Sequence, residues 1–180
     1  MLEIKNKYTS KEKRRGIYSG FFEKFYGTAS RIGAEYFLSP LFILSVAALE
    51  TGFGKHAPFN NFFGIKASQS SKKPRFSART KEFMKEKSNA VMIRDYFRAY
   101  NSFDDSCRDF CLLITKRYPQ CAGVYDSSVC GLLQSNPKRK YATDPEYTGK
   151  LEGIYFVLET IKGERGKEER GKRKGKYLLT

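Results

Sequence analysis

The feature that most constrains the fold is a run of apolar residues at 41–49, Leu-Phe-Ile-Leu-Ser-Val-Ala-Ala-Leu. Ser39 and Pro40 precede this run, and a serine N-cap followed by proline at the first helical position marks a helix start. Gly52 follows it and supplies the backbone freedom that ends a helix. The pattern predicts a core helix over 39–50, because the run is apolar nearly all round and far shorter than the roughly 20 residues that span a bilayer.

A single carboxylate, Glu50, stands in the last turn of this predicted helix. The negative end of the helix dipole and partial removal from water both disfavour the ionised form of a carboxyl, so we expect a raised pKa. A carboxyl that stays protonated near neutral pH can donate its proton to a leaving group. A solvated glutamate at a helix terminus is the alternative, and the residues around Glu50 favour the general acid.

The residues around Glu50 read Ala-Ala-Leu-Glu-Thr-Gly-Phe-Gly-Lys at 47–55 and Asn-Asn-Phe-Phe-Gly-Ile-Lys at 60–66. Together they resemble the signature of the glucosaminidase domains of glycoside hydrolase family 73. Further segments are similar to that family's motifs in the same order: Thr-Lys-Glu at 80–82, Phe-Arg-Ala-Tyr-Asn-Ser at 97–102 and Tyr-Ala-Thr-Asp-Pro-Glu-Tyr at 141–147. Random matching would hardly produce this order across most of the chain.

The resemblance implies an α+β, mostly α, lysozyme-like fold in which a small β-hairpin lobe forms one wall of a cleft. It also implies an endo-β-N-acetylglucosaminidase that cleaves the β-1,4 bond between N-acetylglucosamine and N-acetylmuramic acid in peptidoglycan, with Glu50 as general acid. No metal or organic cofactor is expected. A muramidase or lytic transglycosylase with a single catalytic glutamate is the nearest alternative. An inactive wall-binding or scaffold protein is an alternative of another class.

Hydrolysis of a glycosidic bond usually needs a second carboxylate as base or nucleophile. The Thr-x-Glu match makes Glu82 the candidate, on the hairpin lobe opposite Glu50, with a solvated strand residue as the alternative. The substrate's own N-acetyl group could also replace this carboxylate. The family's last motif makes Tyr141 the third catalytic candidate, through a hydroxyl that bonds the acid or the N-acetyl group. A buried tyrosine packed on the last helix is its alternative.

Five residues are candidates for binding the sugar chain. Asn60 and Asn61 carry amides suited to sugar hydroxyls, although asparagine pairs also build turns. Lys66 could meet carboxylate-bearing groups of the substrate, and Phe63 suits a cleft wall or the core. Phe53 stands where many family members carry Trp. Since the chain has no Trp, a sugar-stacking surface has to come from Phe and Tyr.

Charge divides the chain into a basic N-terminal segment (1–16), a catalytic domain (17–161) and a basic C-terminal tail (162–180). Six Lys/Arg face two Glu in 1–16, and eight face three in 162–176, so these ends hold nine of the fifteen net positive charges. We expect solvated tails that attract anionic wall polymers. A nucleic-acid partner is not expected, because the basic residues crowd the ends rather than interleave with the 27 Phe and Tyr.

Periodicity and turn residues predict the remaining elements. Helices are expected at 17–36, 103–117, 127–134 and 145–161, the last opened by Asp144 as N-cap and ending near Gly163. The hairpin lobe should consist of strands at 80–83 and 90–100, a turn at 87–89 between them and a loop at 67–79 before them.

The four cysteines, Cys107, Cys111, Cys121 and Cys130, lack the spacing of zinc ligands, and the single histidine adds little. We predict buried free thiols, with a bridge to Cys121 or Cys130 as the alternative in an oxidising compartment. Residues 1–16 lack the apolar stretch of a secretory signal. An enzyme of peptidoglycan is nonetheless expected in the periplasm or cell wall, after processing or by way of a flagellar, secretion or phage apparatus.

Overall fold

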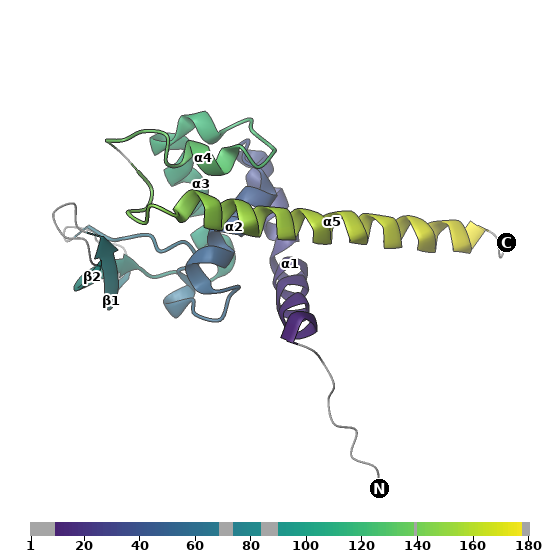
Figure 1. Cartoon of the computed structure of the whole chain (residues 1–180), viewed down its shortest axis with the longest axis horizontal. Helices are drawn as coiled ribbons and strands as arrows, with labels where there is room; N and C mark the ends of the chain where they lie inside the picture. Colours follow the sequence, from purple (N-terminus) through teal and green to yellow (C-terminus); the bar gives the residue numbers. More distant parts are fainter. Residues whose placement is uncertain (1–9, 69–73, 84–89, 139, 178–180) are drawn as a thin grey trace, which may run out of the picture.

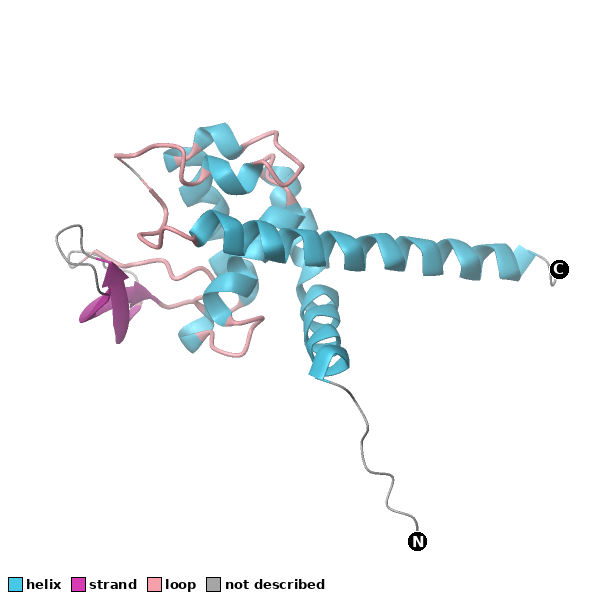
Figure 2. Cartoon of the chain, in the orientation of Figure 1, coloured by secondary structure: helices cyan, strands magenta, loops and turns pink. Residues whose placement is uncertain are grey.

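The computed structural model describes residues 10–68, 74–83, 90–138 and 140–177, with the backbone alone for 10–12, 80–83, 90–91 and 171–177. A helical body carries a two-stranded sheet on one side (Figures 1 and 2). The elements in chain order are α1 (Ser10–Glu35), α2 (Pro40–Thr51), η1 (Pro58–Asn60), β1 (Arg75–Phe83), β2 (Ala90–Arg98), α3 (Phe103–Arg117), η2 (Pro119–Cys121), α4 (Val129–Leu132) and α5 (Tyr147–Tyr177). The expected α+β, mostly α class is confirmed.

Helix α2 is the buried centre of the molecule, as its apolar sequence predicts. The hydroxyl of Ser39 accepts a hydrogen bond from the Phe42 amide at 3.4 Å, and Gly52 ends the helix in the left-handed conformation, with φ 58°. Phe42 and Leu44 have no exposed surface. Because burying a side chain of this size stabilises a fold by roughly 1.5–3 kcal/mol, α2 is firmly anchored. Glu50, in its last turn, is anchored with it.

The other helices close around α2, and their predicted bounds are only partly right. Helices α1 and α5 both pack on α2, while α3 packs on α1. The helix expected at 103–117 is confirmed, with Ser102 accepting a hydrogen bond from the Asp105 amide at 3.1 Å. Helix α4 is shorter than expected. The last helix begins at Tyr147, and Asp144 instead bonds the Glu146 amide in the preceding turn.

The hairpin lobe is longer than the local sequence predicts. Strand β1 begins at Arg75 inside the expected loop, because residues from there onward pair with β2 in antiparallel register, Arg75 opposite Arg98. The Phe76 ring adds a contact with the Phe97 ring at 5.8 Å. The turn expected at 87–89 lies outside the described residues. On the other edge, Ala67 donates to the Tyr96 carbonyl at 2.8 Å, which joins the lobe to the segment that follows α2.

Both basic ends are helical where the structure describes them, rather than irregular tails. Helix α1 starts at Ser10, and α5 continues past Gly163 to Tyr177, extending well beyond the body in Figure 1. Arg15 pairs with Glu164 at 2.7 Å, and Arg165 pairs with Glu23. These ion pairs between α1 and α5 are long-range, so periodicity could not reveal them. Gly163 therefore does not end the helix as expected.

All four cysteines are buried free thiols, which confirms that prediction. Burial raises the pKa of Cys121 to about 11 and that of Cys130 to about 12, so both stay protonated at neutral pH. No helix in the described ranges is both long enough and apolar enough to cross a membrane.

Candidate active site

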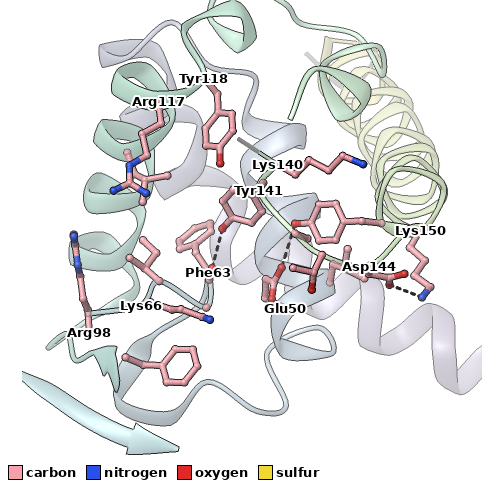
Figure 3. Close-up of a pocket in the computed structure, with 18 residues that line it drawn as sticks. Glu50, Phe63, Lys66, Arg98, Arg117, Tyr118, Lys140, Tyr141, Asp144 and Lys150 are labelled. Carbon is pink, nitrogen blue, oxygen red and sulfur yellow. Dashed lines mark hydrogen bonds and ion pairs between the residues drawn. The ribbon is translucent and has the colours of Figure 1, made fainter. Parts of the chain in front are cut away.

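A cleft of about 590 Å³ opens between the helical body and the hairpin lobe. Figure 3 shows Glu50 among the residues that line it, with Phe63 and Tyr141 nearby. The lining comes from segments far apart in sequence: the end of α2, residues 63–66, the end of β2, the end of α3 and residues 140–150. The predicted cleft, with the hairpin lobe as one wall, is therefore present.

The Glu50 carboxyl is held by contacts on both of its oxygens. Oε1 accepts a hydrogen bond from the Tyr147 hydroxyl at 3.1 Å. Oε2 faces Gly64, whose φ is +61°, and a Cβ atom at Gly64 would lie only 3.1 Å from that oxygen. Glycine is therefore favoured at position 64 both by the backbone conformation and by the close approach of the acid.

The expected rise in the pKa of Glu50 is confirmed. Burial raises it from 4.5 to about 7, and the hydrogen bond from Tyr147 opposes the rise. The side chain is nonetheless open to the cleft. The two observations agree, because a carboxyl at the floor of a concave site can touch water while protein atoms exclude most of the bulk solvent. Glu50 can thus hold a proton near neutral pH and still reach a bound substrate.

Tyr147, rather than Tyr141, contacts the acid. The Tyr141 hydroxyl donates to the Phe63 carbonyl at 2.8 Å, and its ring lies 5.9 Å from the Tyr147 ring. Desolvation raises the pKa of both tyrosines well above the usual value, so both hydroxyls remain donors at neutral pH. Tyr147 closes the motif at 141–147, and that motif is the only sequence signal that could have identified it.

Asn60 and Asn61 hold the loop after α2 rather than line the cleft. The buried Asn61 amide donates to the carbonyls of Ile65 and Arg98 at 3.0 and 2.9 Å, and its oxygen accepts from the Ile65 amide at 3.1 Å. Asn60 donates to the Tyr100 carbonyl at 3.1 Å. The Asn61 amide and the Asn60 nitrogen are bonded within the protein, which agrees with the turn-building alternative. Sugar binding by these two residues stays a prediction.

The two candidate phenylalanines also pack inward. Phe53 turns toward α1, where its ring stacks on Tyr18 with 4.0 Å between centroids, so it does not line the cleft. The Phe63 ring is buried and stacks on Phe110 at 4.2 Å, although Phe63 borders the cleft. Phe53 follows the left-handed Gly52 and has a positive φ of 59° itself, which directs its side chain to the core. Sugar stacking by Phe53 and Phe63 stays a prediction that these inward contacts do not favour.

Lys66 lies on the lobe side of the cleft, and its ammonium is 3.0 Å from Asp95. Glu82 lies on β1 opposite Val91, but its side chain is outside the described part of the structure. The separation between the carboxyls of Glu50 and Glu82 therefore stays a prediction.

A carboxylate on α3 fastens the hairpin lobe to the helical body. The Asp109 side chain accepts from the Arg98 guanidinium at 2.6 Å and from the Tyr100 hydroxyl at 2.7 Å. Charge-assisted bonds of this kind are short and strong. They set the position of the end of β2, which lines the cleft opposite Glu50. Arg98 and Tyr100, both in the motif at 97–102, therefore support the lobe.

Within the described part of the chain, no cluster of His, Cys, Asp and Glu could hold a metal ion. The site is a cleft with one carboxyl of raised pKa at its floor, beside tyrosine hydroxyls. A carboxyl of this kind is the general acid of glycosidic bond cleavage. The fold and the site together define the class as glycoside hydrolases.

The chain belongs to the glucosaminidase family, whose model, described as mannosyl-glycoprotein endo-beta-N-acetylglucosaminidase, matches residues 26–159. It is 32% identical over 126 residues to the peptidoglycan hydrolase FlgJ of Escherichia coli (strain K12), covering 66% of this chain and 40% of that protein. The FlgJ of Vibrio parahaemolyticus is 30% identical over 144 residues, with 74% and 44% covered. The chain thus spans about two-fifths of the length of these relatives.

Solved structures agree with this assignment. A peptidoglycan hydrolase mutant from Sphingomonas sp. A1 is 28% identical, with a TM-score of 0.71 over 81% of this chain and 99% of that one. A truncated glycoside hydrolase domain of Salmonella typhimurium FlgJ is 27% identical, with a TM-score of 0.63 over 79% and 98%. The predicted lysozyme-like fold is confirmed.

Proposed function

We propose that this protein is a peptidoglycan endo-β-N-acetylglucosaminidase that cleaves the β-1,4 bond between N-acetylglucosamine and N-acetylmuramic acid. The observation that carries the proposal is Glu50, a carboxyl with a pKa of about 7 at the floor of the cleft. Membership of the glucosaminidase family and similarity to peptidoglycan hydrolases support the choice of substrate.

Glu50 protonates the departing glycosidic oxygen in this proposal. Tyr147 orients the carboxyl through its hydrogen bond and stabilises the carboxylate that forms when the proton leaves. Tyr141 holds the 63–66 segment against the acid through the Phe63 carbonyl and borders the cleft.

The second half of the reaction needs a group that activates water or stabilises the cationic sugar. We assign this role to Glu82 on the hairpin lobe. Inversion follows if the two carboxyls are more than about 6 Å apart, because water then fits between them. Participation by the N-acetyl group of the substrate is the alternative, in which Glu82 assists without being essential.

The cellular setting belongs to the proposal as well. The substrate is the glycan of the cell wall, which places the protein in the periplasm or cell wall. Relatives named FlgJ are described as peptidoglycan hydrolases. A flagellar, secretion or phage apparatus is the proposed partner for delivery, and anionic wall polymers are proposed ligands of the basic helical ends.

Digestion of purified peptidoglycan by the wild type and by Glu50→Gln tests the proposal. Borohydride reduction and mass spectrometry identify the new reducing ends. Reduced N-acetylglucosamine ends, absent with Glu50→Gln, are expected. Reduced muramic or anhydromuramic ends would assign the protein to the muramidases or lytic transglycosylases instead. Release of no fragments from any wall type would indicate a binding or scaffold protein.

A further inference from the structure

Basic side chains surround the cleft on several sides. Those that line it are Lys66, Arg98, Arg117, Lys140 and Lys150. Three of them are held by carboxylates at 2.6–3.0 Å, in the pairs Lys66–Asp95, Arg98–Asp109 and Lys150–Asp144. These three positive charges are largely balanced inside the protein.

Arg117 and Lys140 differ from the other three. Both are exposed, and neither has an acidic partner among the residues that the structure describes. Arg117 ends α3, whereas Lys140 immediately precedes Tyr141. Figure 3 shows their side chains extending on either side of Tyr118. The cleft therefore presents two separate, uncompensated cations to whatever enters it.

We propose that Arg117 and Lys140 bind carboxylates of the peptides that peptidoglycan carries, so that the cleft prefers glycan with peptides over bare glycan. The inference rests on the proposed function. The sugar rings have no ionised groups once the lactyl carboxyl of muramic acid is joined to a peptide, whereas the peptides carry free carboxylates. Two cations on opposite sides of Tyr118 suit two carboxylates rather than one.

Guanidinium and ammonium groups favour different contacts with this ligand. The planar fork of Arg117 can bind a carboxylate with two parallel hydrogen bonds, whereas Lys140 acts as a point charge on a flexible stem. Both residues are exposed, so screening by water and salt limits each contact. We expect Kd to rise roughly three- to fivefold when either side chain loses its charge, and roughly tenfold or more when both do.

Binding measured in the Glu50→Gln background tests this inference without requiring cleavage. The ligands are soluble glycan chains that carry peptides, the same chains after enzymatic removal of the peptides, and a soluble teichoic acid. The added substitutions are Arg117→Gln and Lys140→Gln, singly and together. Lys116→Gln and Lys138→Gln are matched controls, because both lysines are exposed neighbours that do not line the cleft.

Weaker binding of the peptide-bearing chains alone, with unchanged binding by the controls, is the expected result. Equal losses on both glycans would overturn the inference, since the cations would then contact the sugar or the lactyl carboxylate that removal of the peptide frees. A loss confined to teichoic acid would overturn it in favour of a phosphate ligand. The wild type could release no fragments from peptidoglycan while the substitutions still weakened binding of the peptide-bearing chains alone. That result would contradict the proposed reaction and support the proposed carboxylate sites.

Discussion

At the scale of single residues, the Glu50–Tyr147 pair links geometry to a measurable pH dependence. A general acid works in its protonated form, so activity should fall as pH rises through about 7, the pKa of Glu50. The Tyr147 hydroxyl lowers that pKa because it donates to the carboxylate. Tyr147→Phe should therefore move the alkaline limb of the rate profile upward by roughly half a pH unit to one unit, and lower kcat roughly tenfold.

Tyr141→Phe is the comparison for that measurement. Its hydroxyl donates to the Phe63 carbonyl and not to the acid, so kcat should decrease while the alkaline limb stays in place. Profiles of kcat/KM from pH 5 to pH 9 on soluble glycan separate the two outcomes. If Tyr147→Phe left the limb where it is, the Tyr147 hydroxyl would not control the proton of Glu50.

Gly64 offers a second test of how closely the acid is held. Gly64→Ala puts a side chain at φ +61° and a methyl carbon 3.1 Å from Glu50 Oε2. Backbone strain should cost about 1 kcal/mol of unfolding free energy, and displacement of the acid should lower kcat roughly a hundredfold. Gly123→Ala is the matched control, since its φ is +77° and nothing lies within 4 Å of the new carbon. The control should lose stability and keep its activity; equal activity losses would contradict the model of a tightly held acid.

At the scale of elements, the local sequence pattern predicted the helix ends that are stabilised by residues close by in sequence. The Ser39 and Gly52 caps delimit α2, and Ser102 begins α3, because each cap contacts the first or last turn of its own helix. Elements that contact residues distant in sequence were predicted with the wrong bounds. Strand β1 starts early because β2 pairs with it, and α5 continues past Gly163 beside ion pairs with α1.

In the site, too, features set by the local sequence were predicted and features set by long-range contacts were not. The position of Glu50 in the last turn of α2 predicted its raised pKa, because the apolar run of α2 predicts that the helix is buried. The choice between Tyr141 and Tyr147 as partner of the acid depends on the path of the chain before α5, which no local pattern specifies. The inward direction of Phe53 similarly depends on α1 and its Tyr18 ring.

The attachment of the hairpin lobe depends on Asn61, which bonds both the 61–65 turn and the end of β2. Asn61→Ala would leave the Ile65 amide without its partner and remove one bond each from the Ile65 and Arg98 carbonyls, although the Ile65 carbonyl would still accept from the Arg98 amide. A buried group left without a partner costs about 1–3 kcal/mol. We expect a fall of roughly 2–5 kcal/mol in unfolding free energy by urea denaturation, and looser substrate binding. Asn60→Ala, which removes one bond, should cost about 1 kcal/mol. If Asn61→Ala kept its stability but lost substrate affinity, the amide would bind the sugar after all.

At the scale of the whole molecule, charge and shape separate catalysis from attraction to the wall. The cleft lies at one end of α5, while the basic far end of that helix extends away from the body (Figure 1). Residues 167–176 hold six Lys/Arg against two Glu. Like charges that face solvent raise the rate of encounter with an anionic polymer but do not form a reaction site.

Deletion of residues 167–180 tests this separation, because it keeps Glu164 and Arg165 and therefore the described ion pairs with α1. Thermal stability and kcat on soluble glycan should stay near wild-type values. Sedimentation with intact sacculi at low salt should weaken several-fold, and the difference should vanish at about 0.5 M salt, where the Debye length falls to a few ångströms. Replacing the six basic residues by Gln at full length is the control, and it should match the deletion if charge is the cause. Unchanged binding at low salt in both variants would assign attraction to the cleft, whose exposed Arg117 and Lys140 would then be the first contacts with the wall.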